Sequence, residues 1–491
     1  MKTKHLLVSA FMALTAIAGM NAQQPYSGCW HPDDIRNWSP ETDRDAKFNR
    51  SRVPLAKRFK EPQLMKANDA QWYDGQICNA TILFPTCSRC PSQEDFNFVG
   101  YQPTYLQYMD KMVYWAGSAT KGIICPPPAG STDAAHRAGV RMLGQIFFPP
   151  VNYGGTELWP RQMVLKENGH YPMAIKLYEI AKYMGFDGWF INEEIHGTSR
   201  DEWKAFMDEF YAAAKADGDT NMEIMWYDNT GVPKQDLLNT SATTSQFLEY
   251  NTGVDHRDIA PYLECTDDGI FAKLYNGVEC VKSGLTGYNR WLRDAFPASG
   301  HVGSLALFCP EEHSWKDYVR DLISTSNGHG KPAYEAMQGV FEAEEAAWVN
   351  RDGDPSWTPS ADGSGSAWRG ISGCILERSV IDHMPFVSNM CVGIGKHHFV
   401  NGELCGSRDW WHSGVQSILP TWRWWLDGGE LSATIDWDDA YNFGSSFKIA
   451  GKLNGNALVR LYKTQIPVTD GGKIIIAVKG SDTPELKLPM I

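Results

Sequence analysis

Between about residues 78 and 310, short apolar segments alternate with segments of helical periodicity. The clearest helices are predicted at residues 172 to 184 and 201 to 217, and Ser199 with Glu202 forms a capping box at the start of the second. Such alternation is typical of parallel strands joined by helical crossovers. The strand candidates begin near residues 80, 111, 140, 185, 223, 269, 277 and 303. Eight candidates predict the α/β class, as a (β/α)8 TIM barrel.

The pattern changes after the predicted barrel. Residues 355 to 368 are rich in Ser, Gly and Pro and are expected to form a loop or linker. The short strand-like segments "LSATIDW", "SSFKIAG", "ALVRLY" and "KIIIAVKG" follow, separated by Gly and Asn, and predict a C-terminal β-sandwich domain. The predicted domains are a signal peptide (1–22), a catalytic barrel with an N-terminal extension (23–345), a linker and interdomain segment (346–430) and a β-sandwich, complete or not (431–491).

The charge and the N-terminus restrict the function classes. The net charge is −13 and no basic cluster is present, which argues against a nucleic-acid partner. A basic start, an apolar run from Leu6 to Ala18 and a small-residue site at Ala22 predict a secretory signal peptide. No other segment is apolar enough to cross a membrane, so no transmembrane segment is expected. We therefore expect an exported protein in the periplasm, at the cell surface or outside the cell.

The cysteines and the rest of the chain offer no sign of a cofactor. The count of 11 is odd, so at least one thiol has no partner within the chain. Cys87 and Cys90 form a C-x-x-C pair without a second pair or a spaced histidine, which favours a local disulfide or thiols over zinc. No metal-ligand spacing or phosphate-binding glycine loop is found, and we expect no metal and no cofactor.

The segment "GFDGWFINEEIHG", residues 185 to 197, places polar groups at the end of an apolar strand. Alternation puts Asn192 and Glu194 on one face and Glu193 on the other. Catalytic residues of a barrel lie at the carboxyl ends of its strands. A glycosidase needs an acid to protonate the departing oxygen, and some families let the 2-acetamido group of the substrate attack in place of a protein nucleophile. Glu194 and Asn192 are spaced to supply the acid and to orient that group.

Six further blocks identify a family when they are taken together and in order. They are "DAAHRAGVRMLGQIFF" (133–148), "GFDGWFINEE" (185–194), "WYDN" (226–229), "SLALFCPEE" (304–312), "PFVSNMCVGIG" (385–395) and "DDAYNFGSSFKIAG" (438–451). They resemble motifs of glycoside hydrolase family 85, the endo-β-N-acetylglucosaminidases that cut the chitobiose core of N-glycans. The related D-G-x-D-x-D-x-E motif of chitinases fits less well, because Phe190 and Asn192 replace two of its acids.

The resemblance implies roles for individual residues. Glu194 matches the general acid, Asn192 the residue that orients the acetamide, and Tyr227 a residue that contacts the same group. The implied route is attack by the acetamido oxygen, an oxazoline-like intermediate and entry of water with net retention. The substrate would be an N-linked glycan or a glycoprotein. Residues expected to bind the substrate are Asp187, Trp115, Trp226, Asp228, Gln235 and Tyr275.

Alternatives remain open at this point. The segment Tyr114 to Ser118 lacks both histidines of the family motif Y-F-S-H-H, and residues 234 to 239 lack the tryptophan of W-Q-N-x-L-N. These changes motivate a second hypothesis, a catalytically silent glycan-binding protein on the same scaffold, whereas the intact Asn192, Glu194 and Tyr227 favour the enzyme. A chitinase-like or peptidoglycan-directed endo-hexosaminidase is a third. Glu193 becomes the rival acid if the strand bends, and Asp187 could bond the barrel backbone instead of a sugar.

Overall fold

The structure is a computed structural model, and it describes a defined part of the chain. The described residues are 24–59, 66–67, 71, 75–84, 90–92, 101–249, 270, 272–280, 304–312, 333–349, 370–421, 426–467 and 469–480. The predicted signal peptide (1–22), Cys87 and the linker segment 355–368 lie outside them. The predicted domain boundaries therefore stay predictions. Within the described part, no helix combines the length and the apolar character needed to cross a bilayer.

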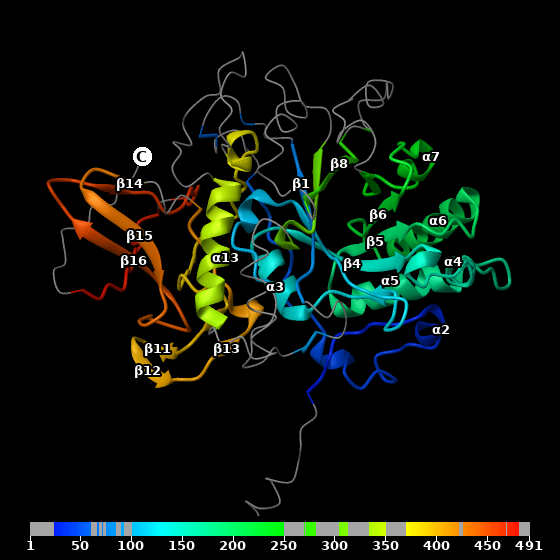
Figure 1. The fold of residues 1–491 in the computed structure, drawn as a ribbon, viewed down its shortest axis with the longest axis horizontal. Helices are drawn as coiled ribbons and strands as arrows, with labels where there is room; N and C mark the ends of the chain where they lie inside the picture. The colour runs from blue at the N-terminus through cyan, green and yellow to red at the C-terminus, as the bar shows by residue number, and fades with distance from the viewer. Residues whose placement is uncertain are drawn as a thin grey trace, which may run out of the picture.

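The described strands include a closed ring of eight parallel strands, which confirms the predicted barrel (Figure 1). They are β1 (Ile77–Thr81), β2 (Lys111–Tyr114), β4 (Arg141–Phe148), β5 (Gly188–Glu193), β6 (Glu223–Asp228), β7 (Ser245–Leu248), β8 (Leu274–Glu279) and β9 (Ser304–Phe308). Pairing of β1 with β9 and of β2 with β4 closes the ring. A two-residue strand, β3 (Ile124–Cys125), pairs antiparallel with the carboxyl half of β4.

Two strand predictions differ from the structure. The candidates near 269 and 277 are one strand, β8, and β7 was not predicted at all. The predicted total of eight was right only because these two errors compensate.

Helices cover the outside of the barrel, and two of them match the predicted helices closely. The described helices are α2 (Pro32–Ile35), α3 (Ala129–Arg137), α4 (Leu158–Met163), α5 (Pro172–Met184), α6 (Arg200–Ala216), α7 (Gln235–Leu238) and α13 (Ala333–Trp348). Helix α5 ends at Gly185, whose left-handed φ of 78° suits glycine. The predicted capping box of α6 is formed by Ser199 and Glu202. Apolar faces of α5 and α6 pack with the outward residues of β4, β5 and β6.

Inward side chains fill the barrel as a separate core. Among them are Val113, Leu143, Phe190, Met225 and Phe247, one from each of five strands. Layers of side chains from alternate strands fill TIM barrels in this way. Because these side chains form an apolar layer across the interior, the polar groups at the carboxyl ends of the strands lie above a solid floor.

Antiparallel sheets follow the barrel, as predicted for the C-terminal part. The described pairs are β10 (Ile394–Gly395) with β13 (Trp410–Trp411), β11 (His398–Val400) with β12 (Glu403–Gly406), β14 (Leu426–Asp427) with β17 (Leu458–Val459), and β15 (Glu430–Asp436) with β16 (Ser446–Lys452). Figure 1 shows α13 between the barrel and these sheets, and Trp437 donates from its indole nitrogen to Gln338 of α13 at 3.0 Å.

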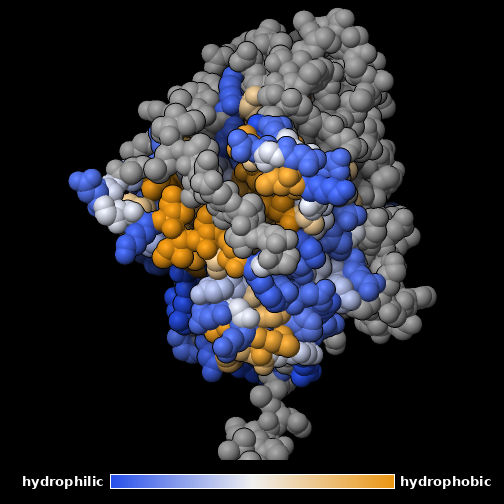
Figure 2. Space-filling view, turned by 90° about the vertical axis from the view of Figure 1, so that its left-hand side faces the viewer, coloured by the Kyte–Doolittle hydropathy of each residue, from blue (hydrophilic) through white to orange (hydrophobic). Residues whose placement is uncertain are grey.

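One predicted strand of this part is not formed. Residues 473 to 480, "KIIIAVKG", are exposed and have no strand pairing with the described residues. Ile475 is 88% exposed. Figure 2 views the side of the molecule on which the C-terminal sheets lie and shows apolar residues gathered there. The apolar residues of this segment are not sufficient to form a strand, because a strand must also hydrogen-bond to the edge of a neighbouring strand.

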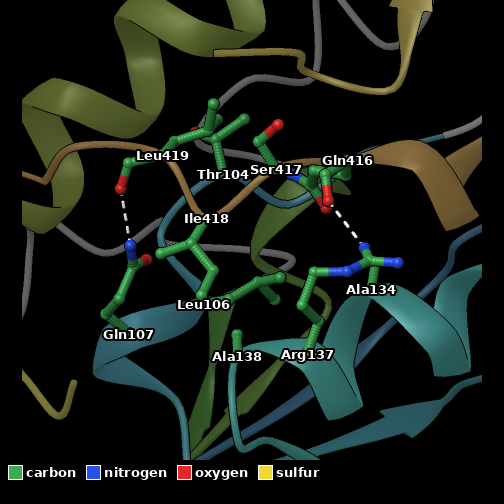
Figure 3. A pocket seen from close by; sticks show the side chains of 10 residues that line it. All are labelled: Thr104, Leu106, Gln107, Ala134, Arg137, Ala138, Gln416, Ser417, Ile418 and Leu419. Atoms are coloured by element: carbon green, nitrogen blue, oxygen red, sulfur yellow. Dashed lines mark hydrogen bonds between the residues drawn. The ribbon is translucent and has the colours of Figure 1, made fainter. Parts of the chain in front are cut away.

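A small cavity lies where the C-terminal part meets the barrel (Figure 3). Its volume is about 10 Å³, room for roughly one water molecule. Arg137 of α3 donates to the carbonyl of Gln416 at 2.7 Å, and Gln107 donates to the carbonyl of Leu419 at 2.5 Å. Hydrogen bonds across this junction hold the two parts together, and the cavity is too small to bind a sugar.

Candidate active site

The carboxyl ends of β5 and β6 bring together the three residues expected to carry the chemistry. Asn192 and Tyr227 are direct partners in the pairing of the two strands. Both face the barrel interior, since Phe190 and Met225, two residues earlier on each strand, belong to the interior core. Only 3% of Asn192 and 5% of Tyr227 is exposed. Glu194 follows on the same face as Asn192, one residue past the end of β5.

Glu194 is a half-buried acid in contact with Tyr227. The tyrosine hydroxyl donates to Oε1 of Glu194 at 3.4 Å, and the Glu194 amide donates to the carbonyl of Phe148 at 3.3 Å. Burial raises the pKa of Glu194 above that of an ordinary glutamate. The hydrogen bond from Tyr227 opposes this rise, while the neighbouring carboxylates of Glu249 and Glu193 add to it. A carboxyl group that keeps its proton to higher pH is suited to general acid catalysis.

Glu193 faces the other side of the strand and is held there. Its carboxylate accepts from the backbone amide of His196 at 2.7 Å and lies 3.0 Å from Nδ1 of the same residue. The other ring nitrogen of His196 lies 2.9 Å from Oδ1 of Asn229, just past β6. Burial raises the pKa of Glu193, and His196 opposes the rise. Glu193 therefore belongs to a clamp between the ends of β5 and β6 and is not positioned as the rival acid.

The charge on Glu193 leads to a prediction about the pH dependence of activity. Glu194 acts as an acid only while protonated, so activity should fall as the pH rises through its pKa. Glu193→Gln removes a negative charge that raises this pKa. We expect the alkaline limb of the pH profile of kcat/KM to move to lower pH, with activity retained at low pH. Glu179→Gln, at an exposed acid of α5, should leave the profile unchanged; a shift toward higher pH in Glu193→Gln would contradict the assignment.

Trp115 also reaches this end of the barrel. It follows β2 and contacts Phe308 edge to face, with ring centroids 4.7 Å apart. Phe190 and Phe147 are its other aromatic neighbours, at 6.1 Å and 5.5 Å. These rings form an apolar wall beside Asn192. Such a wall is suited to the faces of a sugar ring, so the prediction that Trp115 binds substrate stays in place.

Asp187 and Tyr275 are not brought to this end. Asp187 precedes β5, and its carboxylate accepts from the amide of Met142 at 2.7 Å and lies 2.9 Å from Nε2 of His136. Tyr275 stands early in β8, under the ammonium of Lys111 at 4.3 Å from the ring centroid, and donates to Gln76. Both lie toward the amino ends of the strands. These contacts hold the barrel, and the expected contact of both residues with substrate stays a prediction.

Trp226 and Asp228 lie on the outer face of β6, since they alternate with Tyr227. The indole nitrogen of Trp226 donates to Asp228 at 3.0 Å, and its ring packs against Trp203 of α6. Asp228 also accepts from the amide of Thr230 at 3.0 Å, which shapes the turn after the strand. Both side chains thus have contacts within the fold, and their expected contact with substrate stays a prediction. Gln235 is exposed at the start of α7, and its role stays a prediction.

Two polar residues that face the barrel interior near these groups were not singled out in the sequence. Glu249 follows β7 on the inward face, is 5% exposed, and raises the pKa of Glu194. Gln145 lies inside the barrel on β4, between Leu143 and Phe147, and is fully buried. Both carried a signal: "SQFLE" ends in an acid as "GWFINE" does, and Gln145 is a lone amide within the apolar strand "MLGQIFF".

No metal site is formed by the residues that the structure covers, since they contain no group of three His, Cys, Asp or Glu side chains able to hold an ion. Cys90, the described half of the C-x-x-C pair, is buried.

Known proteins with similar sequences indicate the family of this chain. The sequence model of glycosyl hydrolase family 85 matches residues 87–398, more than half of the chain. The chain belongs to this family. It is 24% identical over 464 residues to cytosolic endo-beta-N-acetylglucosaminidase 1 of Arabidopsis thaliana, covering 90% of this chain and 60% of the relative. It is 25% identical over 391 residues to cytosolic endo-beta-N-acetylglucosaminidase of Homo sapiens, covering 74% and 45%.

The family 85 fold is also seen in a solved structure. The glycoside hydrolase domain Endo-D of Streptococcus pneumoniae R6 superposes with a TM-score of 0.70 at 24% identity, covering 91% of this chain and 70% of that one. This likeness supports the barrel with its C-terminal sheets. The chain spans only about half the length of the curated relatives it matches.

One prediction is contradicted by these comparisons. We expected export from the basic and apolar residues at the N-terminus, with a periplasmic, cell-surface or extracellular location. The matched relatives from plant, fish, human and mouse are all named cytosolic enzymes, so the prediction of an exported protein is wrong on this finding. A short apolar run after two lysines is a weak signal, because it depends on composition and not on a packed structure.

Proposed function

We propose that this chain is an endo-β-N-acetylglucosaminidase that hydrolyses the GlcNAc-β-1,4-GlcNAc bond of the N-glycan chitobiose core. The proposal depends mainly on the group formed by Glu194, Asn192 and Tyr227. The pKa of Glu194 is raised, and this acid lies beside the inward amide of Asn192 and the hydroxyl of Tyr227. A binding protein would not need a partly buried acid at this point. The names of the matched relatives support the substrate class.

The proposed reaction is substrate-assisted and retains the anomeric configuration. Asn192 and Tyr227 hold the 2-acetamido group so that its carbonyl oxygen attacks the anomeric carbon. Glu194 gives its proton to the departing glycosidic oxygen, and the C–O bond breaks to leave an oxazolinium ring. The resulting carboxylate of Glu194 then takes a proton from water, which opens the ring from the opposite face. Net hydrolysis leaves one N-acetylglucosamine on the peptide.

The positions of the acids support the substrate amide as the nucleophile. A retaining enzyme with a protein nucleophile needs a second carboxylate close to the first and inside the cleft. Glu193, the sequence neighbour of Glu194, faces outward and is bonded to His196. Glu249 stands on the same side as Glu194, where its charge favours the protonated form of the acid. We therefore assign Glu249 an electrostatic role.

Mass spectrometry of an N-glycopeptide tests both the bond and the role of Asn192. The wild type should leave the peptide with a single N-acetylglucosamine. Asn192→Ala should lower kcat by about 10²–10³, as expected for loss of one preorganised polar contact to the transition state, with a smaller change in KM. Asn221→Ala, at an exposed asparagine, is the matched control and should cleave normally. Release of the whole glycan, or retention of the intact glycan by the wild type, would contradict the proposal; binding without cleavage would favour a silent glycan-binding protein.

A further inference from the structure

Gln145 is a buried amide inside the barrel that the proposed reaction has not yet used. Its neighbours on β4 fix its direction, since Leu143 belongs to the barrel interior and Ile146 to the outer core. Gln145 is 0% exposed. Neither its Nε2 nor its Oε1 has a hydrogen-bond partner among the described residues. A glutamine amide offers two donors and one acceptor, and burying all of them unpaired is costly unless a bound molecule pairs them.

The position of Gln145 relates it directly to Asn192. In the pairing of β4 with β5, Gln145 is opposite Phe190 and Phe147 is opposite Asn192. Gln145 is thus one inward step below Asn192 on the adjacent strand. Oδ1 of Asn192 is likewise buried and without a hydrogen-bond partner among the described residues. Two amides on neighbouring strands, each with unpaired atoms, face the same part of the barrel interior.

The surroundings restrict what can pair these atoms. Phe190 lies beside Trp115, Tyr227 and Phe247, with ring centroids 5.8 to 6.2 Å apart, so the space next to the two amides is otherwise apolar. A secondary amide with a methyl group has the matching chemistry: one N–H donor, one carbonyl acceptor and an apolar end. An ion or the hydroxyl groups of a sugar could pair with the amides but would make no apolar contact with the aromatic rings.

We propose that Gln145 is a further substrate-binding residue, which hydrogen-bonds the 2-acetamido group from the floor of the site while Asn192 and Tyr227 hold it from the side. This inference rests on the proposed function, because it assigns the ligand of Gln145 as the group that attacks in that reaction. The contact makes Gln145 a determinant of selectivity for 2-acetamido sugars.

The test compares two buried glutamines of the barrel strands, one with unpaired side-chain atoms and one with hydrogen-bonded side-chain atoms. Gln145→Met keeps the length of the side chain and removes its hydrogen bonds. Gln246→Met is the matched control, because Gln246 is also buried in a barrel strand but is paired, accepting from the amide of Lys234 at 2.7 Å and donating to the carbonyl of Val232 at 3.0 Å. Each variant is made in the Glu194→Gln protein, and binding of the intact glycopeptide is measured by calorimetry together with the unfolding temperature.

We expect opposite patterns from the two variants. Gln145→Met should bind the glycopeptide about tenfold more weakly and unfold at the same temperature or higher. Gln246→Met should unfold at a lower temperature and bind with unchanged affinity. In the Glu194 background, Gln145→Met should lower kcat/KM by a similar factor. Gln145→Leu repeats the test with a different shape in case methionine packs poorly.

Two results would overturn the inference. Unchanged affinity in Gln145→Met and Gln145→Leu would show that the amide does not contact the substrate. A lower unfolding temperature in both would show that its atoms are paired within the protein. Cleavage by the wild type is measured separately, so these two results would contradict the role of Gln145 and leave the proposed function intact. A wild type that neither cleaves nor binds the glycopeptide would contradict both.

Discussion

Glu194→Gln should lower kcat/KM for N-glycopeptide cleavage by about 10²–10⁴, the usual contribution of a positioned general acid. Glutamine has the shape of glutamate and can still accept from the Tyr227 hydroxyl, but it has no proton to give to the departing oxygen. The loss should therefore appear in the chemical step, with substrate binding largely preserved. Initial rates measured by chromatography of released glycan would give both constants.

The leaving group provides a sharper check on this role. A phenolate departs without help from an acid, so an aryl glycoside of the same oligosaccharide should lose much less activity in Glu194→Gln. Glu193→Gln is the matched variant at the adjacent acid and should keep its activity at low pH, because Glu193 is bonded to His196 outside the barrel. Equal losses on both substrates, or a larger loss in Glu193→Gln, would contradict the assignment of Glu194.

Lys111→Met should lower the free energy of unfolding by about 3–5 kcal/mol, the usual cost of leaving a buried charge without its partner. Lys111 and Glu223 form an ion pair inside the barrel, and 5% and 2% of these residues are exposed. Burial opposes the charge on Lys111, but Glu223 raises the pKa of the lysine. Ser245 donates to the same carboxylate at 2.5 Å, and Arg141 lies 3.2 Å from it. Arg141 should keep the effect toward the lower end of the range.

Denaturant unfolding of a paired variant separates the charge from the packing. Replacing both partners, as Lys111→Met with Glu223→Met, should recover much of the stability, because no charge is then left buried. Both variants should keep the activity of their folded fraction, since this ion pair lies at the amino ends of the strands. If the double variant had a lower free energy of unfolding than Lys111→Met, the destabilisation could not be explained by the unpaired charge of Glu223.

The strands show where sequence patterns were sufficient and where they failed. Strands β5 and β6 were predicted because each is an unbroken apolar run followed by polar residues. Strand β7 was missed because half of it is polar: Ser245 bonds Glu223 inside the barrel, and Gln246 bonds the backbone outside it. Its polar residues are satisfied by partners distant in sequence, so hydropathy gives no sign of a strand.

Strand β8 shows the opposite error. The two candidates were divided at Asn276, but Asn276 and Gly277 both lie within one strand. A Cβ atom on Gly277 would approach the carbonyl oxygen of Leu248 to 2.3 Å, so the glycine permits close packing against β7. A glycine that serves close approach cannot be distinguished from a turn residue until the neighbouring strand is known.

The sequence by itself determined the local geometry of the site. Alternation along a strand put Asn192 and Glu194 on one face and Glu193 on the other. The same alternation separates Trp226 and Asp228 from Tyr227 on β6, although all three were expected to contact the substrate. Helix signals such as Ser199 and Gly185 likewise act within a few residues. These features depend on backbone geometry alone, so no distant part of the chain is needed to predict them.

Only the tertiary structure decided which groups meet. Closure of the barrel brings Glu249 from β7 near Glu194 and raises the pKa of that acid, and it sets the unpaired amide of Gln145 below Asn192. It also assigned Asp187 and Tyr275 to the amino ends of the strands, away from the acid. The physical reason is that burial, electrostatic coupling and the pairing of polar atoms depend on distances between strands, which the fold sets and strand alternation does not contain.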